Sequence, residues 1–201
     1  MMKIAIIDYG LGNLRSVIRG LEKAGANAFI TSDAGEIASA DGLVLPGVGA
    51  FHEGMDQLGP LQRTVVEAAR DVPLLGICLG MQMLMETSEE HGIHQGLGLI
   101  PGRVKRFPKG SGQKVPHMGW NSLRIEQADN PLFTGFKPDE YMYFVHSYYA
   151  DTMPEFTLTT TQYICPFASS VGNRNVFGVQ FHPEKSGAAG LRLLANFIGM
   201  V

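Results

Sequence analysis

Short apolar runs and segments with helical spacing of apolar residues alternate along the first part of the chain. Residues 3–9 form an apolar run with the length and composition of a buried strand. Within 14–24, apolar residues recur every three or four positions, so they line one face of a helix. Asn13 is placed to cap the start of this helix and Gly25 to end it. The pattern predicts a strand followed by an amphipathic helix.

The same alternation continues as far as residue 90. It predicts strands at 27–31, 41–45 and 74–78, and helices at 58–70 and 81–90. Strands that are connected through helices run parallel, and a parallel sheet needs both of its faces covered. The first half therefore predicts a parallel sheet between helices.

The second half is richer in β-branched and aromatic residues, which favour strands. Strands are predicted at 102–107, 120–125, 141–148 and 157–161, several of them antiparallel, and at 167–171 and 176–181 on either side of a hairpin turn at 172–175. A last helix follows Ser186, its predicted N-cap. We predict one α/β domain over residues 1–201. Its central sheet is mixed and mostly parallel, it is flanked by helices, and the functional site lies at the strand ends.

Size, charge and cysteine content narrow the range of functions. Of the 201 residues 45% are hydrophobic, the net charge is −3 and the pI is near 6.1, which does not favour nucleic acid or an anionic membrane as main partner. No apolar stretch approaches the roughly 18 residues of a membrane span, and Asp8 comes too early for a signal peptide. Cys78 and Cys165 do not make a disulfide framework. We expect a cytoplasmic protein, with no metal and no cofactor.

Cys78 lies between two glycines at the end of the predicted strand 74–78. Gly76-Ile77-Cys78-Leu79-Gly80 has the form of a nucleophile elbow, a sharp turn from strand to helix in which flanking glycines avoid Cβ clashes. A helix N-terminus and a nearby imidazolium would both favour the thiolate of Cys78. By itself, a cysteine in an apolar run is more often a buried core thiol.

A base for this thiol is available downstream, in His182-Pro183-Glu184. Side chains two residues apart in an extended segment project to the same face, so Glu184 can reach a ring nitrogen of His182. Pro183 donates no amide and suits a strand end. Taken together with Cys78, this segment predicts a Cys-His-Glu hydrolase.

Attack by Cys78 on a carboxamide produces an oxyanion that needs hydrogen-bond donors. One predicted donor is the backbone N–H of Leu79, directly after the nucleophile. The second is expected from Gly47-Val48-Gly49, whose glycines permit close approach of the backbone to a small substrate. His182 would take the thiol proton, protonate the departing ammonia and then activate water.

Several motifs together resemble a known family. Gly-Ile-Cys-Leu-Gly-Met-Gln at 76–82 and Gln-Phe-His-Pro-Glu at 180–184 resemble the class I, triad-type glutamine amidotransferases. Finer features are similar to the glutaminase subunits of imidazole glycerol phosphate synthases, which act in histidine biosynthesis. These features lie at 8–13, 46–51, 116–121, 143–148 and 183–186. The resemblance covers essentially the whole chain.

The resemblance implies roles for individual residues. Cys78, His182 and Glu184 correspond to the catalytic triad, and Gln82 to the residue that contacts the amino-acid end of L-glutamine, helped by backbone near Gly49, Ser147 and Tyr148. Gln82 follows Cys78 by one helical turn, which places both on one face. Glu90 is a further candidate for the substrate amine, although a surface acid is the commoner role of such a residue.

The resemblance also implies a partner. Ammonia released into water would be protonated, and a glutaminase domain of this size has no room for a second active site. In this family the acceptor enzyme is a (β/α)8-barrel cyclase subunit, which forms a heterodimer with the glutaminase. The cyclase makes imidazole glycerol phosphate and aminoimidazole carboxamide ribotide. The only tryptophan suits an interface anchor, although a core aromatic remains its alternative. The candidate interface residues are Asn13, Met118, Trp120, Asn121, Tyr141 and Lys185.

Two alternatives remain at this point. The chain could be the glutaminase of another ammonia-channelling synthase, such as those of pyridoxal phosphate, anthranilate or guanylate synthesis. The segment at 118–121 favours the histidine pathway. It could also be a non-catalytic binding module on the same fold. Loss of a triad residue would mark that case, and no triad residue is lost.

Overall fold

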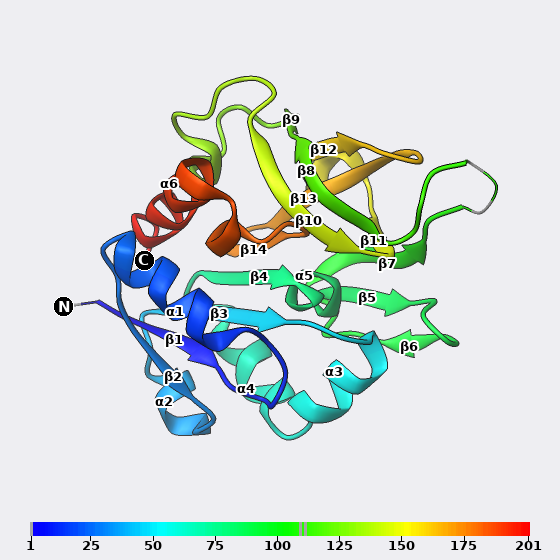
Figure 1. Ribbon diagram of the computed structural model, residues 1–201. Coiled ribbons are helices and arrows are strands. Elements are labelled where there is room, and N and C mark those ends of the chain that lie inside the picture. Colours follow the sequence, from blue (N-terminus) through cyan, green and yellow to red (C-terminus); the bar gives the residue numbers. More distant parts are fainter. Residues whose placement is uncertain (1, 109, 111) are drawn as a thin grey trace.

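The computed structural model describes residues 2–108, 110 and 112–201 (Figure 1). The first half contains β1 (Lys3–Ile7), α1 (Leu14–Lys23), β2 (Asn27–Thr31), α2 (Ala34–Ala38), β3 (Gly42–Gly47), α3 (Phe51–Leu58), α4 (Leu61–Ala68), β4 (Leu74–Cys78), α5 (Leu79–Met83), β5 (Met85–Ser88) and β6 (His94–Gln95). The second half contains β7 (Ile100–Arg106), β8 (His117–Ser122), β9 (Arg124–Ile125), β10 (Tyr141–His146), β11 (Tyr148–Asp151), β12 (Thr157–Gln162), β13 (Pro166–Asn173), β14 (Val176–Val179) and α6 (Gly187–Ile198). Single 3-10 turns are η1 (Pro131–Phe133), η2 (Pro154–Phe156) and η3 (Pro183–Lys185). None of the helices in the described part of the chain has the length and apolar character needed to cross a membrane.

One mixed sheet runs through the molecule in the order β2-β1-β3-β4-β14-β13-β11-β7-β5-β6, with β12 beside β13 and β9 beside β12. From β2 to β14 all neighbouring strands are parallel. The predicted hairpin joins β13 to β14, with Asn173 opposite Val176. β8 and β10 form a separate antiparallel ribbon above the sheet (Figure 1). The predicted α/β fold with a central mixed sheet is confirmed.

Helices cover both faces of the parallel half because its strands are apolar on both sides. In β1, Ile4 and Ile6 join a buried cluster with side chains of α1 and α6. Ala5 and Ile7 alternate with them and join a second cluster with α2, α3 and α4. At the start of α1, the Asn13 side chain accepts a hydrogen bond from the Ser16 amide at 3.3 Å, as predicted.

The predicted start of the helix at 58–70 is wrong. The structure has two helices there, α3 and α4, separated by Gly59 and Pro60. Gly59 has a φ of 33°, and Pro60 has no amide hydrogen with which to continue the first helix. The apolar spacing alone did not reveal this break.

The helix predicted at 81–90 is also wrong. The helix α5 ends at Met83, and β5 begins at Met85. Carbonyls at the end of α5 accept hydrogen bonds from the segment 97–100 instead of from the next helical turn. β5 then pairs in parallel with β7. Contacts with a distant segment therefore override the local helical pattern.

Candidate active site

Cys78 occupies a strained turn between β4 and α5. Its φ of 56° and ψ of −109° lie in a region that residues other than glycine rarely adopt. A Cβ at Gly76 would lie 2.8 Å from the Gly80 carbonyl carbon, and one at Gly80 would collide with the Leu45 carbonyl oxygen. Both glycines are therefore required for the close approach of α5 to β3 and β4. This geometry is that of a nucleophile elbow.

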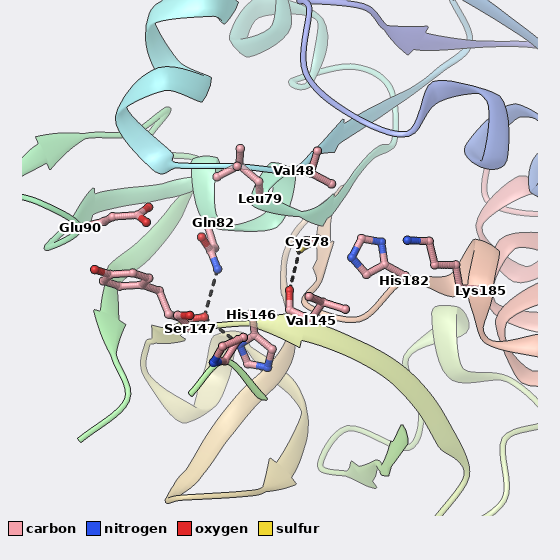
Figure 2. A pocket seen from close by; sticks show the side chains of 13 residues that line it. Val48, Cys78, Leu79, Gln82, Glu90, Val145, His146, Ser147, His182 and Lys185 are labelled. Atoms are coloured by element: carbon pink, nitrogen blue, oxygen red, sulfur yellow. Dashed lines mark hydrogen bonds between the residues drawn. The ribbon is translucent and has the colours of Figure 1, made fainter. Parts of the chain in front are cut away.

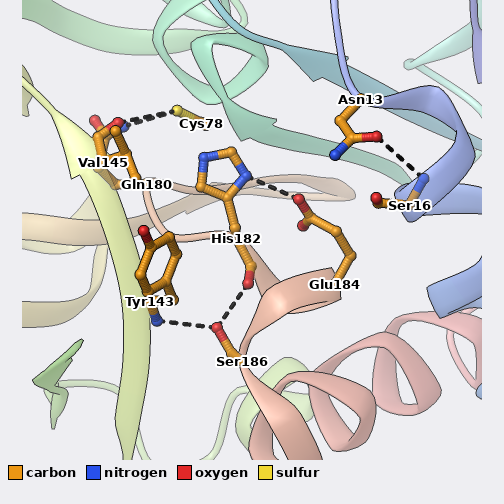
Figure 3. A network of polar contacts seen from close by, with 9 residues as sticks. All are labelled: Asn13, Ser16, Cys78, Tyr143, Val145, Gln180, His182, Glu184 and Ser186. Atoms are coloured by element: carbon orange, nitrogen blue, oxygen red, sulfur yellow. Dashed lines mark hydrogen bonds and ion pairs between the residues drawn. The ribbon is translucent and has the colours of Figure 1, made fainter. Parts of the chain in front are cut away.

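The catalytic candidates His182 and Glu184 follow β14, the parallel neighbour of β4. His182 Nδ1 lies 2.9 Å from Glu184 Oε1, and the two side chains are 5% and 1% exposed (Figure 3). The other carboxylate oxygen of Glu184 is buried, with no hydrogen-bond partner among the described residues. The negative charge of Glu184 is therefore directed mainly at the imidazole.

The backbone around His182 is fixed by the β8–β10 ribbon. The His182 amide donates to the Tyr143 carbonyl at 2.9 Å. Ser186 Oγ donates to the His182 carbonyl at 2.6 Å and accepts from the Tyr143 amide at 3.0 Å (Figure 3). Ser186 does stand at the N-cap position of α6, as predicted, but its side chain makes no capping hydrogen bond. It holds the catalytic loop to β10 instead.

The charge state of His182 depends on its two neighbours. Burial lowers the pKa of His182, but interactions with the Cys78 sulfur and the Glu184 carboxylate raise it, and together they bring it to about 9. At neutral pH the imidazole therefore carries a proton.

A cavity of about 310 Å³ opens in front of Cys78 and His182 (Figure 2). All the predicted substrate-binding residues line it, as do three of the four predicted oxyanion residues. The predicted residues in its wall are Val48, Gly49, Leu79, Gln82, Ser147 and Tyr148. Gly47 is not in the wall. It is buried in β3, where a Cβ would meet the Tyr9 hydroxyl and Leu79.

Three residues in or beside this cavity were missed or undervalued from the sequence. Gln180 is fully buried, and its Nε2 lies 3.7 Å from Cys78 Sγ. Its position two residues before His182 in an extended segment was the available signal. Glu90 is not a free surface acid, because it lines the cavity and accepts the Phe51 amide at 2.7 Å. His146 also lines the cavity, and although it lies within the motif at 143–148, no role was predicted for it.

The predicted interface residues fall into two groups. Met118, Trp120 and Tyr141 lie on the outer face of the β8–β10 ribbon and are 63%, 55% and 57% exposed. Asn121 also lies on β8, but its side chain points to the inner face of the ribbon. There its amide nitrogen donates to the Gln162 carbonyl at 2.9 Å. Asn13 and Lys185 are exposed, and Lys185 lies at the edge of the cavity (Figure 2).

The described residues contain no group of three or more histidine, cysteine, aspartate or glutamate side chains arranged to hold a metal ion.

Solved structures share this architecture. The glutaminase domain of Trypanosoma brucei CTPS with bound acivicin superposes with a TM-score of 0.73 at 18% identity, covering 100% of this chain and 93% of that one. PurLQS from Thermotoga maritima gives a TM-score of 0.74 at 19% identity, with 98% of each chain covered. At such identities the likeness concerns the fold alone.

Sequence comparison identifies the family. The family described as "Glutamine amidotransferase class-I" matches residues 5–200. The chain is 56% identical to "Imidazole glycerol phosphate synthase subunit HisH" of Methanosarcina mazei, with 100% of both chains covered. It is 50% identical to the protein of the same name from Archaeoglobus fulgidus, with 98% of each covered. The family indicated by the motifs is thus confirmed. The chain belongs to the class I glutamine amidotransferases, and within them to the HisH glutaminase subunits of imidazole glycerol phosphate synthase.

Proposed function

We propose that Cys78, His182 and Glu184 hydrolyse L-glutamine to glutamate and ammonia, and that the ammonia is delivered to a cyclase subunit docked on this chain. One observation carries the proposal. A cysteine held in a strained elbow faces the same cavity as a buried histidine–carboxylate pair. These are the parts that a thiol nucleophile needs for acyl transfer.

In the first step the Cys78 thiolate attacks the carboxamide carbon of glutamine. The C–S bond forms as the carbonyl π electrons move to oxygen, giving a tetrahedral oxyanion. When this intermediate collapses, the C–N bond breaks and the His182 imidazolium gives its proton to the nitrogen, which leaves as ammonia. The product on the enzyme is a glutamyl thioester of Cys78, and His182 is left neutral.

In the second step neutral His182 takes a proton from water as the water oxygen attacks the thioester. Collapse of this second intermediate releases glutamate and returns the Cys78 thiolate with the His182 imidazolium. Throughout, Glu184 orients the ring of His182 through Nδ1 and stabilises its charged form.

The oxyanion donors are assigned to Leu79 and to the loop after β3. The Leu79 amide is the first of α5, while Val48 and Gly49 form the facing wall of the cavity. Gly49 has a φ of 108°, and a Cβ there would approach only Glu53, so this peptide has space to rotate. Rotation that adds or removes one donor changes such rates by about 10²–10³-fold, enough for a switch that leaves the triad in place.

The amino-acid end of glutamine is assigned to the opposite end of the cavity. Gln82, Ser147 and Tyr148 lie there, together with the carboxylate of Glu90 (Figure 2). An acid at this end is complementary to the α-ammonium group, and the substrate carboxamide then reaches Cys78. This arrangement also favours the binding of glutamine over that of substrates that lack the ammonium group.

The cyclase is assigned to the outer face of the β8–β10 ribbon. Met118, Trp120 and Tyr141 are large apolar side chains that stand more than half exposed on neighbouring positions of this ribbon. Clusters of exposed aromatic and Met side chains are typical of protein interfaces. Lys185 and Asn13 extend the proposed interface toward the loop that carries His182 and Glu184. Asn121 is assigned a supporting role from its inner face.

We predict that Cys78→Ser lowers the pKa of His182 from about 9, because burial then acts with only Glu184 to oppose it. In the unaltered enzyme, kcat/KM for glutamine should fall as the pH rises through about 9, since the leaving ammonia then finds no proton on His182. An NMR titration of the imidazole measures the first effect, with Cys165→Ser as the matched control. An unchanged pKa in Cys78→Ser would show that the thiol does not interact with His182.

We also predict that Cys78→Ser abolishes glutamine-dependent synthesis by the complex with the cyclase, while synthesis from added ammonia persists. The serine hydroxyl is a much poorer nucleophile than a thiolate, and the cyclase site is untouched. Cys165→Ser should retain both activities, because Cys165 lies outside the cavity. The assignment is wrong if Cys165→Ser silences glutamine-dependent synthesis and Cys78→Ser does not.

A third prediction concerns the partner surface. Trp120→Ala should weaken binding of the cyclase at least about 10-fold, the usual effect of removing a buried aromatic anchor. Its indole contacts the Tyr143 ring at 6.0 Å between centroids and is 55% exposed, so the fold should tolerate the change. Isothermal titration with the cyclase measures the affinity. The control Ile93→Ala removes a 71% exposed side chain elsewhere and should bind normally. Equal affinities of the two variants would place the interface on another surface.

A further inference from the structure

A chain of hydrogen bonds runs under the β8–β10 ribbon toward the glutamine cavity. His117 and His146 face inward from the two strands and are 3% and 6% exposed. His117 Nδ1 lies 3.0 Å from His146 Nε2, and His146 Nδ1 lies 2.8 Å from the Tyr148 carbonyl oxygen. The same carbonyl accepts a hydrogen bond from Gln82 Nε2 at 3.1 Å. The two histidines therefore connect β8 with a residue of the cavity wall.

The outer end of this chain is fixed by Asn121. Its Nδ2 donates to the Gln162 carbonyl at 2.9 Å, and its Oδ1 accepts from the Ser122 amide at 2.8 Å. These two hydrogen bonds are compatible with only one orientation of the Asn121 side-chain amide. In that orientation Nδ2 also faces His117 Nε2 at 3.3 Å. Nδ2 can only donate, so the Nε2 of His117 must be the acceptor.

The two ends together set the tautomers of both rings. A neutral His117 that accepts at Nε2 carries its hydrogen on Nδ1 and donates it to His146 Nε2. His146 then carries its own hydrogen on Nδ1, which is required because the Tyr148 carbonyl can only accept. A hydrogen on the Nε2 of either ring would face another N–H. All the bonds therefore run in one direction, from Asn121 to Tyr148.

Burial keeps both rings in this neutral form. It lowers the pKa of His117 to about 4. Burial also lowers the pKa of His146, to about 3. The hydrogen bond to the Tyr148 carbonyl opposes this shift, and the nearby positive charge of His182 adds to it. The ring of Phe167 packs near both imidazoles, with centroids 6.0 and 5.1 Å away, and accepts no hydrogen bond from them.

The Tyr148 carbonyl, which can only accept, decides which atoms of Gln82 face the substrate. Gln82 Nε2 gives one hydrogen to Tyr148 and the other to Gln180 Oε1 at 3.0 Å, so its Oε1 is the polar atom left for a ligand. Figure 2 shows that this oxygen lies on the side of Glu90. Because Gln180 accepts through its oxygen, its Nε2 is directed at Cys78 Sγ, 3.7 Å away.

We propose that His146 is a positioning residue for glutamine binding, and that His117 and Asn121 fix its tautomer. This inference rests on the proposed function. His146 holds the Tyr148 carbonyl in the position where it accepts from Gln82 Nε2, and this leaves the Gln82 oxygen as an acceptor for the α-ammonium group of glutamine. The same bond, passed on through Gln82, makes Gln180 present an N–H to the thiolate. With the Gln82 amide turned over, its NH2 group would face the ammonium group and oppose binding.

The kinetic test uses the full chain in complex with the cyclase. His146→Leu removes the donor to Tyr148, and the KM for glutamine should rise about 10- to 100-fold, the range for a lost hydrogen bond to a charged group. The fall in kcat should be smaller than this rise in KM. His146→Asn places an amide nitrogen near the position of Nδ1 and should recover most of the affinity.

Phe167→Leu is the matched control for packing. It removes ring contacts from both histidines but breaks no hydrogen bond, so it should lower the Tm and leave KM near its original value. The proposal is overturned if His146→Leu leaves KM unchanged, or if Phe167→Leu raises KM as much as His146→Leu does.

An NMR measurement tests the tautomers without any variant of His146. In the ¹⁵N-histidine spectrum of the full chain at neutral pH, His117 and His146 should both be neutral and carry hydrogen on Nδ1. An Nε2–H tautomer or an imidazolium at either position overturns the inference, even in an active enzyme. By contrast, an unaltered complex that fails to hydrolyse glutamine would contradict the proposed function, whatever the tautomers are.

Discussion

The site depends on one backbone constraint, the turn at Cys78. A non-glycine residue at a φ of 56° costs about 1–3 kcal/mol, and it persists only where the surrounding structure imposes it. Here β3 and β14 hold β4 on both sides, and α5 presses so closely on them that neither Gly76 nor Gly80 has room for a Cβ. As a result, Cys78 lies at the end of a central strand and its thiol is directed into the cavity.

The same parallel pairing brings His182 close to Cys78. In the register of β4 and β14, Ile77 lies opposite Val179, so Cys78 and Gln180 follow side by side and His182 comes two residues later. The backbone of His182 is then bonded to Tyr143 in the β8–β10 ribbon, whose outer face carries Trp120. A partner bound on that face thus contacts the element that holds His182.

Much of this could be predicted from the sequence, because the signals were local. The strand 74–78 and the helix after Asn13 follow from apolar spacing and capping residues. The glycines around Cys78 predict the elbow. The contact of His182 with Glu184 was also predicted, but for an extended segment, whereas in the structure Glu184 lies in the 3-10 turn η3. In each case the residues that decide the structure lie within a few positions of one another.

The features that could not be predicted depend on contacts distant in sequence. β5 replaces a helix because the segment 97–100 satisfies the carbonyls at the end of α5. Neither the hydrogen bond from the Phe51 amide to Glu90 nor the pairing of His117 with His146 leaves a local pattern. Asn121 shows the limit most clearly. Trp120 beside it on β8 is 55% exposed, but the alternation of the strand turns the Asn121 side chain inward.

The central claim is that the elbow makes Cys78 the one reactive thiol of the glutamine cavity. A diazoketone analogue of glutamine places an electrophilic carbon where the substrate carboxamide would lie, and mass mapping of the peptides locates the resulting covalent adduct. We expect the adduct on Cys78, at a rate that glutamine reduces by competition. Modification of Cys165 in place of Cys78, or labelling of Cys78 that glutamine does not slow, would contradict the account.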